Sequence, residues 1–65
     1  MKLSINGKLR ETGAVTLEAL FGELALLPEL LLVEHNGIAL HRSEWSAIRL
    51  AEGDCLELLS VAAGG

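Results

Sequence analysis

The chain has 65 residues, of which 51% are hydrophobic, and a formal net charge of −4. This length allows one domain with a packed core, and the acidic balance argues against nucleic acid as a partner, because phosphate binding needs clustered Lys and Arg. No apolar run approaches the roughly 20 residues that cross a bilayer, and the N-terminus lacks the apolar core of a signal peptide. The single cysteine, Cys55, excludes an internal disulfide and is typical of a reducing compartment. We therefore expect a single domain over 1–65 in the cytoplasm, with neither nucleic acid nor membrane as a partner.

A β-hairpin is predicted at the start of the chain. Apolar and polar residues alternate up to Ile5, the alternation breaks at Asn6-Gly7, and it then resumes. Asn-Gly between two alternating segments is the strongest short-range signal for a two-residue hairpin turn, because both central positions need a positive φ. We expect strands over 2–6 and 8–12.

An amphipathic helix is predicted next. Its apolar residues recur at helical spacing and form one stripe: Leu17, Leu20, Phe21, Leu24 and Leu27. The Thr16 hydroxyl can cap the first turn, and the Glu18 carboxylate suits the positive end of the helix dipole. Pro28 is expected to end the helix, because the residue before a proline avoids the α region.

The second half of the chain contains three further predicted strands, over 30–35, 38–40 and 55–61. A second Asn-Gly pair, at 36–37, is expected to turn the chain between the first two of them. Ser43 is a candidate cap for a helical turn that holds Trp45 against the core. A turn is predicted over 51–54, before the last strand.

The order of these elements favours an α+β fold. One main helix among so few strands gives a mixed sheet of four or five strands with the helix packed on one face. Pairing the first strand with the last in the middle of the sheet protects both from exposed edges and leaves the C-terminus projecting. This arrangement is the β-grasp, or ubiquitin-like, architecture.

The last four residues, Ala62, Ala63, Gly64 and Gly65, are too small to pack well. Glycine has no Cβ and lets another backbone approach closely, so this segment suits insertion into a narrow enzyme channel. Its reactive group is the α-carboxylate of Gly65, which becomes an electrophile once it is activated, for example as an acyl-adenylate. We expect a flexible tail over 62–65 with Gly65 as the reactive residue. The alternative interpretation is a frayed terminus that ends on two glycines by chance.

The last strand is expected to have two different faces. Leu56 and Leu58 share a parity and should face the helix. Leu59 and Val61 then point the other way and form an apolar spot beside the tail, where an adenylating enzyme could dock. Scattered exposed hydrophobic residues are also ordinary on protein surfaces, so both interpretations stay open.

The sequence offers no constellation of catalytic or metal-binding residues. Cys55 has no C-x-x-C partner and is interpreted as a structural thiol at a strand start, with a covalent link to a partner as the alternative. His35 and His41 have no Cys or carboxylate at metal-ligand spacing, so no metal site is predicted. The acidic residues are dispersed, which leaves no candidate catalytic carboxylate pair. We therefore expect that the protein is not an enzyme.

Several residues of the second half form a pattern that resembles a known family. They are Asn36, Arg42, Ser43, Trp45, Gly53, Asp54, Gly64 and Gly65. Their order and spacing are similar to those of the sulfur-carrier proteins of thiamine biosynthesis, the ThiS family. The resemblance extends over the whole chain in length and element order. One departure is His41, where the family often has a proline before the arginine.

The resemblance implies a function for the C-terminus. Gly65 would be adenylated by a ThiF-like adenylyltransferase that uses ATP and Mg, and then converted to a thiocarboxylate with sulfur from a donor such as a cysteine desulfurase. The thiocarboxylate would give its sulfur to a ThiG-like thiazole synthase. The chain itself would bind no cofactor and act as a protein cosubstrate. Two alternatives stay open: a sulfur carrier for molybdopterin or another pathway, and a noncovalent β-grasp interaction module.

Overall fold

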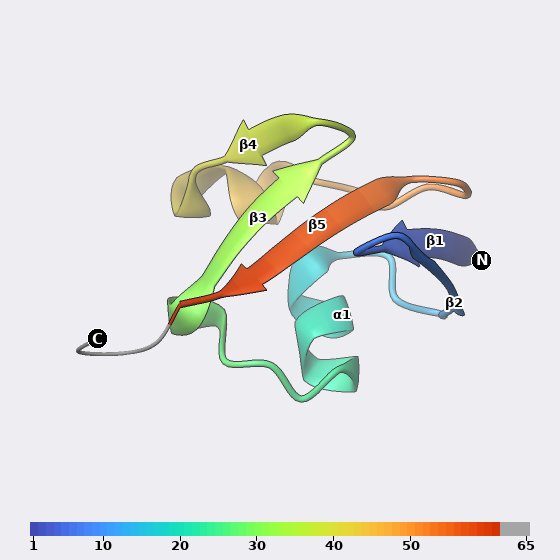
Figure 1. Cartoon of the computed structure of the whole chain (residues 1–65), viewed down its shortest axis with the longest axis horizontal. Coiled ribbons are helices and arrows are strands. Elements are labelled where there is room, and N and C mark those ends of the chain that lie inside the picture. The colour runs from blue at the N-terminus through green and yellow to red at the C-terminus, as the bar shows by residue number, and fades with distance from the viewer. Residues whose placement is uncertain (62–65) are drawn as a thin grey trace.

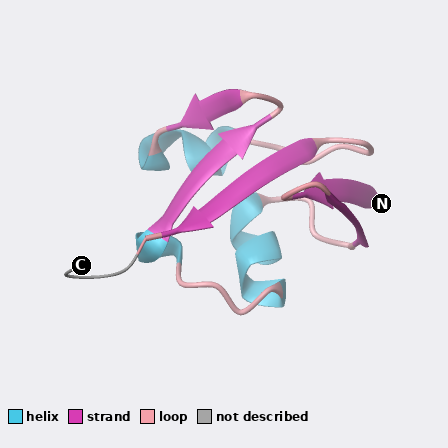
Figure 2. Cartoon of the chain, viewed as in Figure 1, coloured by secondary structure: helices cyan, strands magenta, loops and turns pink. Residues whose placement is uncertain are grey.

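The computed structural model describes residues 1–61, and this part contains five strands, one α-helix and two short 3-10 helices (Figure 1, Figure 2). The strands are β1 (Lys2–Ile5), β2 (Lys8–Glu11), β3 (Leu31–His35), β4 (Ile38–Leu40) and β5 (Cys55–Ser60). The helices are α1 (Leu17–Glu23) and the 3-10 helices η1 (Pro28–Leu30) and η2 (Arg42–Ala47). The predicted strands are all present, with boundaries within one residue of the prediction. Within residues 1–61, no helix has the length and apolar character needed to span a membrane.

The five strands form one sheet in the order β2-β1-β5-β3-β4. β1 and β5 are parallel, whereas the other neighbouring pairs are antiparallel. β5, the last strand in sequence, therefore lies in the centre of the sheet (Figure 1). The predicted pairing of the first strand with the last is confirmed, and the sheet with α1 against one face has the β-grasp architecture.

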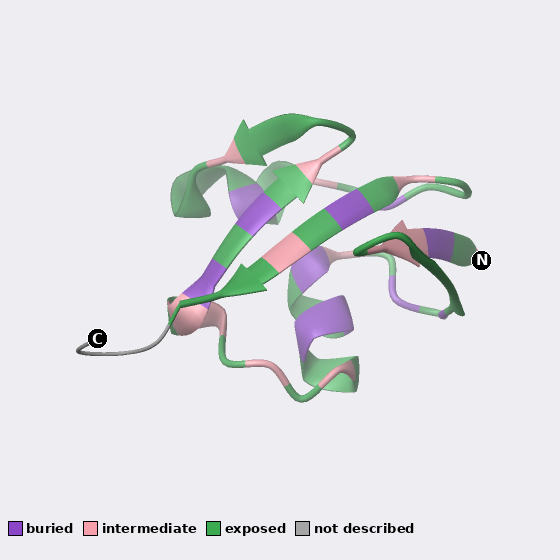
Figure 3. Cartoon of the chain, viewed as in Figure 1, coloured by how far each residue is buried: buried purple, intermediate pink, exposed green. Residues whose placement is uncertain are grey.

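The hydrophobic core lies between α1 and one face of the sheet. Burial alternates along β3 and β5, as their pleat requires (Figure 3). The buried hydrophobic residues are Leu3, Ala14, Leu17, Leu20, Phe21, Leu31, Val33, Trp45, Leu50 and Leu56. The Trp45 ring packs against the Phe21 ring at an interplanar angle of 70°, with the centroids 5.2 Å apart. The prediction that both aromatic side chains fill the core is confirmed.

α1 starts as predicted but ends earlier. Thr16 Oγ1 accepts a hydrogen bond from the Ala19 N–H (3.2 Å), which confirms the predicted N-cap. The helix ends at Glu23, several residues before Pro28. Leu27, predicted to continue the buried stripe, is 59% exposed. The prediction that Pro28 ends the helix is therefore wrong.

A Schellman motif ends α1 instead. The backbone at Ala25 adopts the left-handed conformation, with φ at 57°. The Ala25 N–H donates to the Gly22 carbonyl (3.2 Å), and the Leu26 N–H donates to the carbonyl of Phe21 (2.9 Å). These two bonds satisfy carbonyls that the end of a helix otherwise leaves without partners, so the chain turns away from the helix axis here.

η2 begins at Arg42, one residue before the predicted cap, Ser43. The residue that precedes the helix is His41, whose backbone N–H donates to Glu44 Oε1 (2.7 Å). A glutamate at the third helical position reaches back in this way in a capping box. The prediction that Ser43 caps this helical turn is therefore wrong, whereas Trp45 is buried as predicted.

Candidate functional site

β5 carries the chain from the centre of the sheet toward the C-terminus. The last backbone hydrogen bond of the described residues runs from the Val61 N–H to the Leu30 carbonyl (2.7 Å). Gly65, the predicted reactive residue, and the rest of the predicted tail, 62–64, lie outside the described residues. The described part of the site is thus the end of β5 and the surface around it.

The face of the sheet opposite α1 carries paired exposed leucines. Leu32 on β3 and Leu59 on β5 are Cα partners in the antiparallel ladder, and their exposed fractions are 56% and 61%. Val61 is exposed as well, so the predicted exposure of Leu59 and Val61 is confirmed. Sequence reasoning missed Leu32, although its place between buried Leu31 and Val33 gives the same alternation. Leu32, Leu59 and Val61 are called the apolar patch below.

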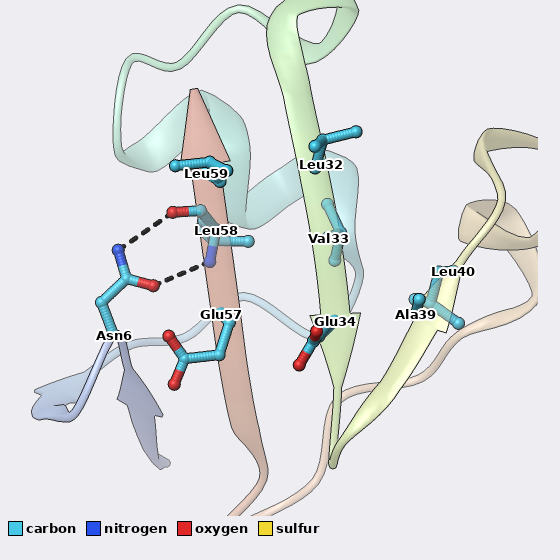
Figure 4. Close-up of a pocket in the computed structure, with 9 residues that line it drawn as sticks. All are labelled: Asn6, Leu32, Val33, Glu34, Ala39, Leu40, Glu57, Leu58 and Leu59. Carbon is cyan, nitrogen blue, oxygen red and sulfur yellow. Dashed lines mark hydrogen bonds between the residues drawn. The ribbon is translucent and has the colours of Figure 1, made fainter. Parts of the chain in front are cut away.

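An open groove of about 610 Å³ lies over β5, β3 and β4 and includes part of this patch (Figure 4). Its lining includes Leu32, Leu59 and two carboxylates, Glu34 and Glu57, which are Cα partners on neighbouring strands. Like charges directly opposite each other are unfavourable in a sheet. Within residues 1–61, the ion pairs involve other acidic residues. The face therefore combines apolar area with negative charge.

The Asn6 side chain borders the same groove from the turn between β1 and β2 (Figure 4). Its Oδ1 accepts a hydrogen bond from the Leu58 N–H (2.7 Å), and its Nδ2 donates to the Leu58 carbonyl (3.1 Å). The two residues are 52 positions apart in the sequence. Asn6 has a φ of 53°, as the predicted Asn-Gly turn requires. Sequence reasoning predicted the turn but not this contact with β5.

A polar cluster joins the start of β5 to the turn after β3. The Asp54 carboxylate lies 2.8 Å from His35 Nε2 and accepts hydrogen bonds from Asn36 Nδ2 (3.2 Å) and from the backbone N–H of Ala51 (3.0 Å). Burial acts to raise the pKa of Asp54, but these hydrogen bonds outweigh it and hold the pKa below its ordinary value. Asn36 Oδ1 also accepts from the Cys55 N–H (2.8 Å), so the cluster fixes where β5 begins.

Cys55 and the two histidines have separate environments. The Cys55 side chain is exposed at the first residue of β5, so it does not fill the core as a structural thiol would. His35 contacts Asp54, whereas His41 lies before η2. In the part of the chain that the structure describes, no group of three or more His, Cys, Asp or Glu side chains could hold a metal ion.

Comparison with known families covers almost the entire sequence. The model of the ThiS family matches residues 3–65. The chain belongs to the ThiS family. The match includes the first hairpin and α1, where the sequence resembled the family only in element order, as well as the motif residues of the second half.

Solved structures similar to this ThiS-family chain share its whole fold. The crystal structure of the thiamine biosynthesis protein (ThiS) from Geobacter metallireducens has a TM-score of 0.83 and 33% identity, and the match covers 100% of both chains. A solution structure of a thiamine biosynthesis protein from the same organism has a TM-score of 0.80 and 30% identity. It covers 100% of this chain and 88% of that one. The β-grasp prediction is thereby confirmed.

One longer protein contains a segment similar to this ThiS-family chain. A thiazole synthase from Paramagnetospirillum magneticum (strain AMB-1) is 38% identical over 66 residues. The match takes in 100% of this chain but 20% of that protein, so the chain spans about one fifth of the length of this relative.

Two motif residues of the ThiS-family pattern, Arg42 and Trp45, have structural contacts. The Arg42 guanidinium lies over the Trp45 ring, 4.9 Å from its centroid, and its Nη2 donates to the Pro28 carbonyl (2.8 Å). Arg42 thereby ties η2 to η1, which directly precedes β3. At His41, where the family often has proline, the backbone N–H bonds to Glu44, a bond that proline cannot donate.

Proposed function

We propose that this chain is a sulfur carrier for the thiazole of thiamine and that Gly65 bears the sulfur as a thiocarboxylate. The observation that supports this most strongly is the family match, which runs through Gly65. The place of β5 supports it further. Because β3 pairs with β5 as far as Ser60, and the Val61 N–H still bonds to the Leu30 carbonyl, the residues that follow start from an anchored strand.

The proposed chemistry begins with activation of the Gly65 carboxylate, which is too poor an electrophile to accept sulfur directly. With ATP and Mg bound by a ThiF-like adenylyltransferase, a carboxylate oxygen attacks the α-phosphorus of ATP and pyrophosphate leaves. A persulfide, formed from cysteine by a donor such as a cysteine desulfurase, then attacks the acyl carbon and AMP leaves. A thiol reductant cleaves the remaining S–S bond and releases the thiocarboxylate. The chain is a cosubstrate, and the partner enzymes supply the catalytic groups.

A thiazole synthase is the proposed acceptor of the sulfur. The match of the whole chain to part of a thiazole synthase from Paramagnetospirillum magneticum supports this partner. In a thiocarboxylate the sulfur is soft and nucleophilic, which suits transfer to a carbon electrophile of a thiazole precursor.

The apolar patch is the proposed docking site of the adenylyltransferase. Leu32, Leu59 and Val61 are exposed beside the strand that leads to the tail, so an enzyme bound there has the terminus within reach. Burial of apolar area contributes about 25 cal/mol per Å² removed from water. The sheet face opposite the core thus supplies binding energy without disturbing the fold.

The test is the mass of the full chain after incubation with ATP, Mg, a ThiF-like enzyme, a cysteine desulfurase, cysteine and a thiol reductant. The expected product has one carboxylate oxygen replaced by sulfur, mapped by fragmentation to Gly65. Mapping matters because oxidation of Met1 or Cys55 adds nearly the same mass. Cys55→Ser is the matched control, since it removes the exposed thiol and leaves the terminus intact.

Deletion of Gly65 provides the second arm of the test. The deleted chain is expected to lose all sulfur transfer and to stay folded, because glycine has no side chain to pack and the core that the structure describes is built from other residues. Thiazole formation supported by the deleted chain contradicts the proposal. An unmodified wild-type terminus, with an enzyme that is active on another carrier, indicates a noncovalent interaction module instead.

A further inference from the structure

The pairing between β1 and β5 stops short of the end of β5. The last Cα partners of the two strands are Ile5 and Leu56, and the Asn6 N–H then donates to the Leu56 carbonyl (2.9 Å). β5 continues to Ser60. The segment of β5 nearest the tail therefore has a neighbouring strand, β3, on one side only.

The side of β5 that β1 leaves open holds the backbone groups of Leu58. Bonding directions alternate along a strand of an antiparallel ladder. Val61 donates to Leu30 on the β3 side, so Leu58, three residues earlier, directs its N–H and C=O to the opposite side. The Asn6 side chain occupies this place and bonds both groups, at 2.7 and 3.1 Å (Figure 4).

The Asn6 carboxamide thus takes the place that a further residue of β1 would occupy beside Leu58. Its carbonyl oxygen accepts and one of its two N–H groups donates, so it bonds both the N–H and the C=O of Leu58 as a residue on a neighbouring strand does. Because both backbone groups of Leu58 are bonded, this residue is held on the β1 side as well as by β3. Leu58 is also half-buried against the core, so the bonds fix a point from which the chain runs on to its C-terminus.

We propose that Asn6 is a positioning residue for sulfur transfer, because its two bonds to Leu58 fix the end of β5 from which the C-terminal residues depart. The inference rests on the proposed role of Gly65. With both bonds present, Leu58 has less freedom to move, and less freedom is lost when the carrier binds with its C-terminus in the adenylating site. Without them, a docked carrier presents its terminus in the right orientation less often.

Asn6→Gly separates this role from the role of Asn6 in the turn. Glycine adopts a positive φ readily, so the turn is kept and both bonds to Leu58 are lost. Asn36→Gly is the matched control. Asn36 has a φ of 51°, also precedes a glycine, and its side chain binds the other end of β5 at the Cys55 N–H (2.8 Å).

Adenylation of each full chain is measured as pyrophosphate release over a range of carrier concentrations. For Asn6→Gly we expect kcat/KM to fall about tenfold, the size of effect that one or two net hydrogen bonds give, whereas Asn36→Gly stays near wild type. Hydrogen exchange of the Leu58 amide in the free protein accelerates in Asn6→Gly. The affinity of Gly65-deleted chains for the adenylyltransferase is expected to be unchanged by Asn6→Gly, because β3 still pairs with β5 and holds Leu59 and Val61 in the apolar patch.

An unchanged kcat/KM in Asn6→Gly, or an equal fall in both glycine variants, overturns the inference. Asn6→Asp keeps the acceptor for the Leu58 N–H but loses the donor, and it replaces Asn6→Gly if that variant does not fold. A wild-type rate in Asn6→Asp also overturns the inference. If the wild-type chain is never adenylated, both the proposed function and this inference fail. If the wild type is active and Asn6→Gly is unaffected, only this inference fails.

Discussion

Single polar side chains that join distant parts of the sequence hold β5 in place. Asn6 bonds to Leu58 at one end, and His35 and Asn36 bond to Asp54 at the other. In each bonded pair, at least one residue lies at or beside a tight turn. The turns therefore do more than reverse the chain, because their side chains also fix the central strand.

Asp54→Asn is expected to lower stability in a pH-dependent way. Hydrogen bonds hold the pKa of Asp54 below its ordinary value, so the folded state favours the carboxylate. This contribution is fully present above the ordinary aspartate pKa and is lost as pH falls through the lowered folded-state value. We expect the variant to lose about 1–2 kcal/mol of unfolding free energy at pH 7 and to converge on the wild type as pH falls below about 4.

Urea unfolding at a series of pH values measures this effect. Glu29→Gln, which removes an exposed carboxylate, controls for the general loss of negative charge. A difference in unfolding free energy between Asp54→Asn and wild type that is the same at every pH contradicts the assigned role of these hydrogen bonds.

Among the elements, the end of α1 shows how far the apolar pattern predicts the backbone. The stripe continues through Leu24 and Leu27, which indicates a helix up to Pro28, yet the chain leaves the helix at Ala25. Glycine or asparagine is the usual signal of a left-handed residue after a helix, and alanine gives none. The helix start, by contrast, carries its signal in Thr16 and was predicted.

Ala25→Gly is expected to stabilise the protein. A left-handed alanine costs about 1–2 kcal/mol, and the greater freedom of glycine in the unfolded chain offsets about 0.4–1 kcal/mol of the gain. We therefore expect a net increase in unfolding free energy of about 0.5–1 kcal/mol. Thermal or urea unfolding measures it. Ala19→Gly, the same change at an exposed position inside α1, should destabilise by about as much. Destabilisation by Ala25→Gly contradicts the explanation of the helix end.

In the candidate site, too, features with a local sequence signal could be predicted and features that depend on distant contacts could not. The alternation in β5 predicts that Leu59 is exposed, and the two Asn-Gly pairs predict both hairpins. The partner of Asn6 could not be predicted, because no local pattern identifies which of the later residues lies opposite. The exposure of Leu32 could have been predicted from the alternation with its buried neighbours in β3. Its pairing with Leu59 could not, because it depends on the register between β3 and β5.

On the scale of the whole molecule, the two faces of the sheet have different roles. One face packs on α1, and the other presents the apolar patch. Leu59→Asp is expected to weaken binding to the adenylyltransferase at least tenfold, or about 1.4 kcal/mol, while changing stability little because Leu59 is exposed. Calorimetric titration of the enzyme with each carrier measures the affinity.

Leu9→Asp is the matched control for this prediction. Leu9 is even more exposed, at 78%, but lies on the edge strand β2. Equal affinities of the two aspartate variants contradict docking at the patch.

The central place of β5 also has a consequence during protein synthesis. β1 and β3 are not neighbours in the sheet, since each pairs with β5. While the nascent chain emerges from the ribosome, its two hairpins stay unconnected until Cys55–Ser60 has been made, and such long-range pairing is slow to form. A chain that stops before Cys55 lacks the strand that joins the hairpins, so we expect it to be unfolded and open to proteolysis. Folding of the sheet therefore depends on Cys55–Ser60, the one strand that pairs with both hairpins among the described residues.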